Sequence, residues 1–113
     1  MSELTAATAW LMALQRQLKL FHWQTKTYGH HMALGEAHDN LTAEIDSFFE
    51  CGAGQTRVPS AMAAEIRNQP LEDFVSDKQV RRIVKQSLER AQDWHLDGTL
   101  KILQKLAYLL RLQ

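Results

Sequence analysis

The chain has 113 residues, of which 45% are hydrophobic, and this length suits one domain with a single modest core. Thirteen Lys and Arg residues balance thirteen Asp and Glu residues, which excludes a strong overall field for nucleic acid or an anionic membrane. The one cysteine, Cys51, excludes an internal disulfide and a CxxC zinc or redox motif.

Targeting and membrane signals are absent from the sequence. No apolar run approaches the roughly 20 residues that a membrane helix requires. The segment MSELTAATAW also lacks the basic and then apolar order of a signal peptide. We therefore expect a single cytoplasmic domain over residues 1–113. Strand-type alternation is nearly absent and helical periodicity recurs, so the fold is predicted to be all-α.

Two long helices are predicted in the first half of the chain. The first runs from about residue 3 to 27, and Gly29 then interrupts the pattern. The second runs from about 30 to 51, where the CGAG stretch at 51–54 stops it. The apolar stripe of the first helix comprises Leu4, Ala7, Leu11, Leu14, Leu18, Phe21 and Thr25. The stripe of the second comprises Leu34, Leu41, Ile45 and Phe48.

The middle of the chain is predicted to be a connector. Residues 52–76 carry both prolines, and AMAAEIRN at 61–68 is expected to form a short helix inside this segment. A third long helix should begin near Asp77, directly after Ser76, and HLDGT at 95–99 should end it. Its predicted buried residues are Val80, Ile83, Val84, Leu88, Ala91 and Trp94.

The last helix, LKILQKLAYLLRL, is apolar on two sides. One stripe comprises Leu103, Ala107 and Leu110, and the other comprises Ile102, Leu106 and Leu109. Because a small bundle covers only one side, the second stripe is predicted to meet a second subunit. A final helix wedged between two neighbours in the same chain would show the same pattern. The whole order predicts a four-helix bundle with one long crossover between helices two and three, the connectivity of ferritin-like folds.

Four of the five histidines lie between His22 and His38. At 100° per residue, His22 points into the bundle at the end of the first helix. On the second helix, an edge of imidazoles lies beside an edge of carboxylates. The imidazoles are His31 and His38, and the carboxylates are Asp39, Asp46 and Glu50 at i, i+7 and i+11. Mixed imidazole and carboxylate ligation suits iron, manganese or zinc better than calcium or magnesium.

A structural interpretation of the same residues stays open. A histidine near an apolar stripe is often a hydrogen-bonded core residue, and a row of acids on a helix is often a solvated face. We assign His30 and His95 to this structural class. Trp23, directly after His22, would by default be a packing residue.

The order of residues adds a resemblance. LKLFHWQTKTYGHHMALGEAHDNLTAEIDSFFE resembles the segment that identifies Dps-like miniferritins, in which a His-Trp pair ends the first helix and a Leu-His-Glu-x-x-Asp element opens the second. The stretch HWQTKTYGHHMALG resembles even more closely a short, phage-type branch of ferritin-like proteins, which has the pattern HWQTKSY-x-x-H-K-A-L-G. The resemblance covers about residues 4–50.

This resemblance implies a metal site for which two chains supply the ligands. Position by position, His22 matches the first-helix ligand and Asp39 the second-helix aspartate. Glu50 matches a carboxylate that the family contributes across a dimer interface. His31 fits the second histidine of the short branch, and Trp23 matches the tryptophan adjacent to the iron site.

Two positions depart from the family pattern. The second-helix histidine of the family falls on Gly35 here, and its last glutamate falls on Gly54. His31 or His38 is a candidate substitute for the former, whereas no residue replaces the latter. The Glu-x-x-His pairs of larger di-iron bundles are absent, which excludes a standard four-carboxylate centre.

Three functional classes are therefore expected, in order. The first is a miniferritin-like binder of iron, or of zinc or manganese, that oxidises and stores ferrous ion as a dimer or a multiple of one. The second is a ferritin-like bundle without redox activity, serving as an oligomeric structural or virion-associated protein, in the bacterial cytoplasm if phage-encoded. The third, a DNA-compacting protein, is disfavoured. The basic face formed by Lys78, Arg81, Arg82 and Lys85 is interrupted by Glu89, and no lysine-rich tail is present.

Overall fold

The helices follow the predicted order, including the short helix expected inside the connector. The computed structural model describes residues 3–53 and 62–112, and within these ranges it has five helices and no strand. They are α1 (Glu3–Gln24), α2 (Tyr28–Ala53), α3 (Met62–Arg67), α4 (Asp77–Asp93) and α5 (Asp97–Arg111). The domain is all-helical and measures 44 × 24 × 21 Å.

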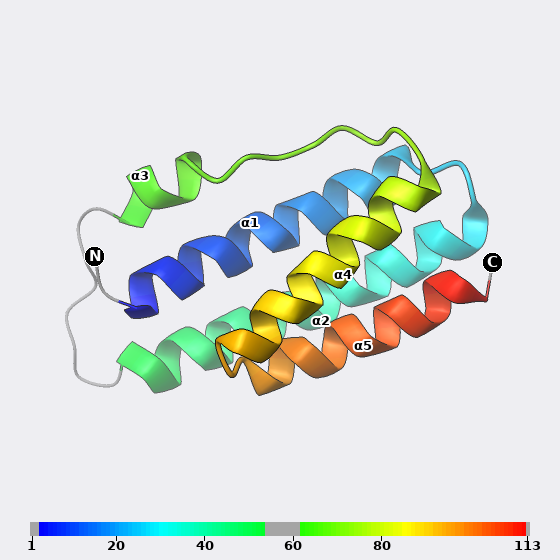
Figure 1. Ribbon diagram of the computed structural model, residues 1–113. Helices are drawn as coiled ribbons and strands as arrows, with labels where there is room; N and C mark the ends of the chain where they lie inside the picture. The colour runs from blue at the N-terminus through cyan, green and yellow to red at the C-terminus, as the bar shows by residue number, and fades with distance from the viewer. Residues whose placement is uncertain (1–2, 54–61, 113) are drawn as a thin grey trace.

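Figure 1 shows two antiparallel helix pairs joined by a long segment. α1 and α2 form the first pair, and α4 and α5 form the second. The segment that contains α3 returns along the length of the molecule beside α1, so α4 runs in the same direction as α2. α5 packs against both α2 and α4.

The core follows the predicted apolar stripes closely. The buried members of these stripes are Ala7, Leu11, Leu14, Leu18, Phe21, Leu34, Leu41, Ile45, Val80, Val84, Ala91, Leu103 and Leu110. Phe48, Ile83 and Leu88 pack against this core and are partly buried. Trp94 was predicted to be buried, but it is 41% exposed. The reason is that it ends α4 and lies edge-on against Trp10, with ring centroids 5.8 Å apart.

Glutamine side chains of α1 hold the returning segment in place. The amide of Gln17 donates to the backbone carbonyl of Glu72 at 2.9 Å and accepts from the backbone N–H of the same residue at 2.8 Å. Gln24 accepts from the N–H of Phe74 at 2.7 Å. These bonds satisfy backbone groups that have no partner in a regular element. Ser76 then caps α4, forming a capping box with Gln79.

One helix boundary was predicted wrongly at a glycine. Gly29 does not separate the helices, because α1 ends at Gln24 and the carbonyl of Thr27 already accepts the N–H of His31 at 2.9 Å. α2 runs to Ala53, within the CGAG stretch at 51–54 that was predicted to stop it. Gly54 lies outside the described residues. A helical glycine costs only about 1 kcal/mol, which packing against neighbouring helices offsets.

The two-stripe prediction for the last helix is wrong at Leu106. This side chain is 1% exposed and belongs to the core, together with Leu103 and Leu110. Because α5 contacts both α2 and α4, its buried arc is wider than one stripe, as the wedged-helix alternative expects. Ile102 and Leu109 are partly buried at the edge of that arc.

Candidate metal site

An open groove of about 610 Å³ lies where the end of α1, the first half of α2 and the end of α5 meet. Lys19 and His22 line it from α1, and Gly35 and Asp39 line it from α2. Leu109 closes it from α5. The groove is therefore lined by a predicted imidazole ligand, His22, and by a predicted carboxylate ligand, Asp39. The α1–α2 hairpin brings the helices of these two residues together.

His22 and His31 form a reciprocal pair beside this groove. Their rings stack with centroids 3.9 Å apart and an interplanar angle of 17°. Nδ1 of His22 lies 2.6 Å from the carbonyl oxygen of His31, and Nδ1 of His31 lies 2.8 Å from the carbonyl oxygen of His22. Because a carbonyl only accepts, each Nδ1 carries a proton, so in the neutral form of each ring the lone pair lies on Nε2. Metal-binding histidines are held in this way.

Gly35 gives His22 the room for this position. A Cβ atom at residue 35 would lie 2.7 Å from Cε1 and 2.9 Å from Nδ1 of His22. The imidazole therefore packs directly on the backbone of α2. In the resemblance, Gly35 occupies the place of the second-helix histidine, and in the structure the ring of His31 lies against His22 instead.

Asp39 is exposed at the rim of the groove. Its Oδ1 accepts from Nδ1 of His38 at 3.0 Å. This hydrogen bond is the largest cause that holds the pKa of Asp39 below its ordinary value; desolvation opposes it, and the nearby Lys19 and, when protonated, His38 and His22 lower the pKa further. The carboxylate is thus kept ionised, which is the form that binds a cation. His38 is engaged with Asp39 and does not line the groove.

The remaining predicted ligands lie elsewhere on the same helix. Asp46 and Glu50 are exposed, and Glu50 follows Asp39 by eleven residues, or about 16 Å along the axis at 1.5 Å per residue. Within residues 3–53 and 62–112, no three His, Cys, Asp or Glu side chains lie close enough to hold one metal ion. The described residues of one chain therefore do not form a complete ligand set.

The other histidines have structural positions. His30 is 2% exposed, and its Nδ1 lies 3.1 Å from Oδ1 of Asp77 while its Nε2 lies 3.3 Å from the carbonyl oxygen of Leu110. It thereby links α2 to α4 and α5. His95 has a φ of 57° in the turn between α4 and α5 and is exposed. Trp23 is not a packing residue, because it is 67% exposed, with Nζ of Lys19 at 5.6 Å from its ring.

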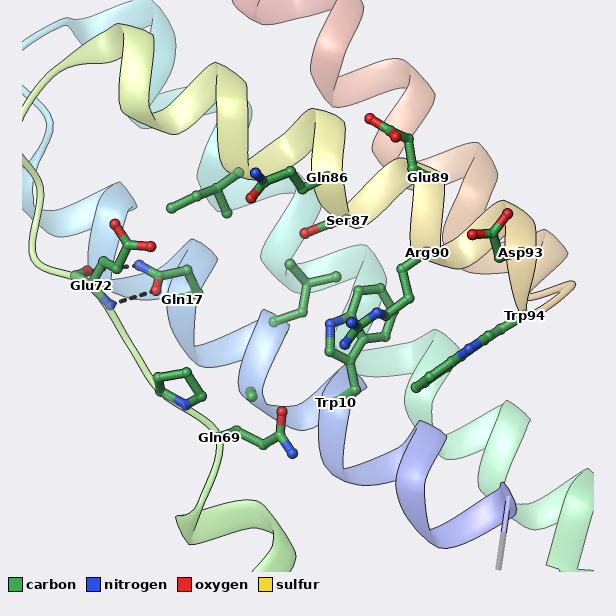
Figure 2. A pocket seen from close by; sticks show the side chains of 14 residues that line it. Trp10, Gln17, Gln69, Glu72, Gln86, Ser87, Glu89, Arg90, Asp93 and Trp94 are labelled. Carbon is green, nitrogen blue, oxygen red and sulfur yellow. Dashed lines mark hydrogen bonds between the residues drawn. The ribbon is translucent and has the colours of Figure 1, made fainter.

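A second groove, of about 660 Å³, lies between α1, α4 and the returning segment (Figure 2). At one end, the guanidinium of Arg90 lies 5.7 Å from the ring of Trp10 and 5.1 Å from that of Trp94. This cluster was not predictable from spacing, because Trp10 is distant in sequence from Arg90 and Trp94. Its cation is already stacked on both rings, and Gln17 is bonded to Glu72, so the groove presents no converging ligand set (Figure 2).

Comparisons with known proteins assign no family. No family model matches the chain, and no curated protein or solved structure matches it. None of the helices in the described ranges is long and apolar enough to cross a membrane.

Proposed function

We propose that the protein binds ferrous ion at sites shared between two chains and oxidises it for storage, as miniferritins do. The observation that carries this proposal is the reciprocal His22–His31 pair, in which both Nδ1 atoms are bonded to carbonyls and both Nε2 atoms keep a lone pair. Zinc and manganese share this preference for imidazole and carboxylate and are the expected competitors.

The helix directions support a ferritin-like assignment. α2 and α4 run the same way because the segment between them returns along the molecule, which is the one-crossover connectivity of ferritin-like bundles (Figure 1). The short helix α3 lies within that crossover. The candidate ligands His22 and Asp39 lie on α1 and α2, the two helices that would carry them in such a bundle.

A second chain is needed to complete the proposed site. The stacked rings of His22 and His31 are nearly parallel, so their lone pairs do not converge on one ion. Asp39 shares the groove with His22, and we assign the missing ligand to Glu50 of the partner subunit. Symmetric pairing in which each chain lends its acid to the other's histidine would build two such sites per dimer.

The ligand set suits a one-electron oxidation of the bound substrate. Imidazole nitrogen retains affinity for ferrous ion, and carboxylate oxygen favours the harder ferric product. Each ferrous ion would give one electron to dioxygen or peroxide, and the ferric ion would then hydrolyse. Trp23, exposed next to His22, is placed to absorb a stray oxidising equivalent.

The rate of aerobic ferrous oxidation, compared with buffer, tests this function. We expect the wild-type protein to accelerate the reaction, and His22→Ala or Asp39→Ala to abolish the gain without loss of helicity. His95→Ala is the matched control, because it removes an exposed imidazole outside the groove. A wild-type rate equal to that in buffer would contradict the ferroxidase proposal.

The second candidate is a ferritin-like assembly protein without redox activity. It is favoured by the lack of a complete ligand set in the described part of one chain. Exposed apolar side chains near the groove, namely Tyr28, Met32 and Leu112, are 76%, 53% and 61% exposed and suit a subunit contact. Assembly at native mass with no bound metal and no acceleration of oxidation would favour this candidate.

A further inference from the structure

A narrow groove of about 220 Å³ lies between α4 and α5, apart from the candidate metal site. Its lining is apolar or cationic, with no acidic side chain. The apolar lining residues are Val84, Leu88, Ala107 and Leu110, and the cationic ones are Arg81, Lys85 and Arg111. A groove with this composition is complementary to a ligand that carries both an anionic and an apolar part.

The three cations are available to a ligand. Arg81, Lys85 and Arg111 are exposed, and none of them has an ion pair, hydrogen bond or ring contact with another residue of the described chain. Nearby cations differ in this respect. Arg82 pairs with Glu72, and Lys105 pairs with Glu36. Three unpaired cations thus line this one groove, beside an apolar floor.

The groove is polar at one end and apolar at the other. α4 and α5 run antiparallel, so the start of α4 lies beside the end of α5 (Figure 1). Arg81 and Arg111 therefore share one end, and Leu88 and Ala107 lie toward the other. From Arg81 to Leu88, the groove follows α4 for about 10 Å at 1.5 Å per residue.

We propose that this groove binds a free, single-chain fatty carboxylate of medium length. The carboxylate would lie between Arg81 and Arg111, whose guanidinium groups match it with paired hydrogen bonds, and Lys85 would add charge. The alkyl chain would lie over Leu88 and Ala107. The groove is narrow, at about 220 Å³, which suits one alkyl chain. An apolar floor is of no use to a nucleic-acid backbone.

Titrating the protein with decanoate tests the proposal. The decanoate concentration stays below the value at which it aggregates, and binding is measured by calorimetry and by changes in amide chemical shifts. We expect one saturable site per chain, with shifts confined to the facing sides of α4 and α5. The double variant Arg81→Gln with Arg111→Gln should bind about tenfold more weakly, because each partly exposed ion pair contributes several-fold. Ala107→Phe, which fills the tail end, should abolish binding.

The matched control is Arg16→Gln with Lys101→Gln, which removes the same charge from exposed sites outside the groove and should bind as the wild type does. Circular dichroism of every variant monitors the fold. Equal binding of acetate and decanoate, or an unchanged affinity in the Arg81 and Arg111 double variant, would overturn the proposal. Binding to anionic phospholipid vesicles or to an acidic peptide without binding to decanoate would also overturn it.

Discussion

The imidazole rings of His22 and His31 stack 3.9 Å apart, and each ring bonds through Nδ1 to the backbone carbonyl of the other residue. These bonds fix both rings relative to the α1–α2 turn. The carbonyl of His22 belongs to the last turn of α1, where it has no intrahelical partner, so His31 also caps that helix. One arrangement therefore stabilises the hairpin and leaves both Nε2 atoms with a lone pair.

Gly35→Ala should disturb this pair. The new Cβ would lie 2.7 Å from Cε1 of His22, so the ring must move, and we expect a loss of stability of about 1–3 kcal/mol together with weaker metal binding. Gly52→Ala is the control, because its Cβ would meet only the flexible end of Leu4, at 2.9 Å. Thermal unfolding compares the two variants. Equal or higher stability of Gly35→Ala would contradict the packing of His22 on α2.

His30 offers a contrast between a structural and a functional histidine. His30→Ala would leave the carboxylate of Asp77 and the carbonyl of Leu110 without their imidazole partner. We expect this to cost about 1–3 kcal/mol, with more for the cavity, while the folded fraction still binds metal. His22→Ala should show the opposite pattern, with a larger loss of metal affinity than of stability. The melting temperature and the metal affinity of both variants distinguish the two roles.

Substitutions at two leucines of α5, Leu106 and Leu109, should separate effects on folding from effects on assembly. Leu106→Asp buries a charge in the core and should abolish cooperative unfolding, since replacing such a leucine even by alanine costs about 2–5 kcal/mol. Leu109→Asp, at the rim of the metal groove, should keep the helicity and lower the native mass toward 13.0 kDa. Sedimentation and circular dichroism measure both effects. A wild-type protein that sediments as a monomer at micromolar concentration would rule out the dimer.

The carboxylate of Asp39 should contribute to stability only at pH values at which it is ionised. Its folded pKa is lowered, chiefly by the hydrogen bond from His38, so the contribution is fully present above the ordinary carboxyl pKa of about 3.9 and is lost as pH falls through the folded value. The difference in melting temperature between the wild type and Asp39→Asn should therefore shrink below about pH 4. A difference that grows on acidification would contradict this assignment.

The periodicity of the sequence was sufficient to predict the helices and most of the core. Leu11, Leu18 and Leu41 are buried as the spacing indicates, because each stripe faces the centre of the domain. The prediction from spacing failed at Leu106, because the width of the buried side of a helix depends on how many helices surround that helix. It also failed at Trp94, whose position depends on the turn that follows α4.

The candidate site was predictable only in part. Helical geometry placed Asp39, Asp46 and Glu50 on one side of α2, and the structure leaves all three exposed. The contact of His22 with His31 was not predictable, because it depends on the path of residues 25–27 and on the absence of a side chain at Gly35. The role of His38 as a partner of Asp39 likewise depends on side-chain rotamers rather than on spacing.

Complementation between two inactive variants tests the shared metal site most directly. His22→Ala and Glu50→Ala should each fail to bind ferrous ion tightly. After the two are unfolded and refolded together in equal amounts, about half of the dimers contain one chain of each kind, and each of these has one intact site of two. We predict that the mixture binds about one quarter as much iron per chain as the wild type. A mixture that binds no more iron than the separate variants would contradict a site built from His22 of one chain and Glu50 of the other.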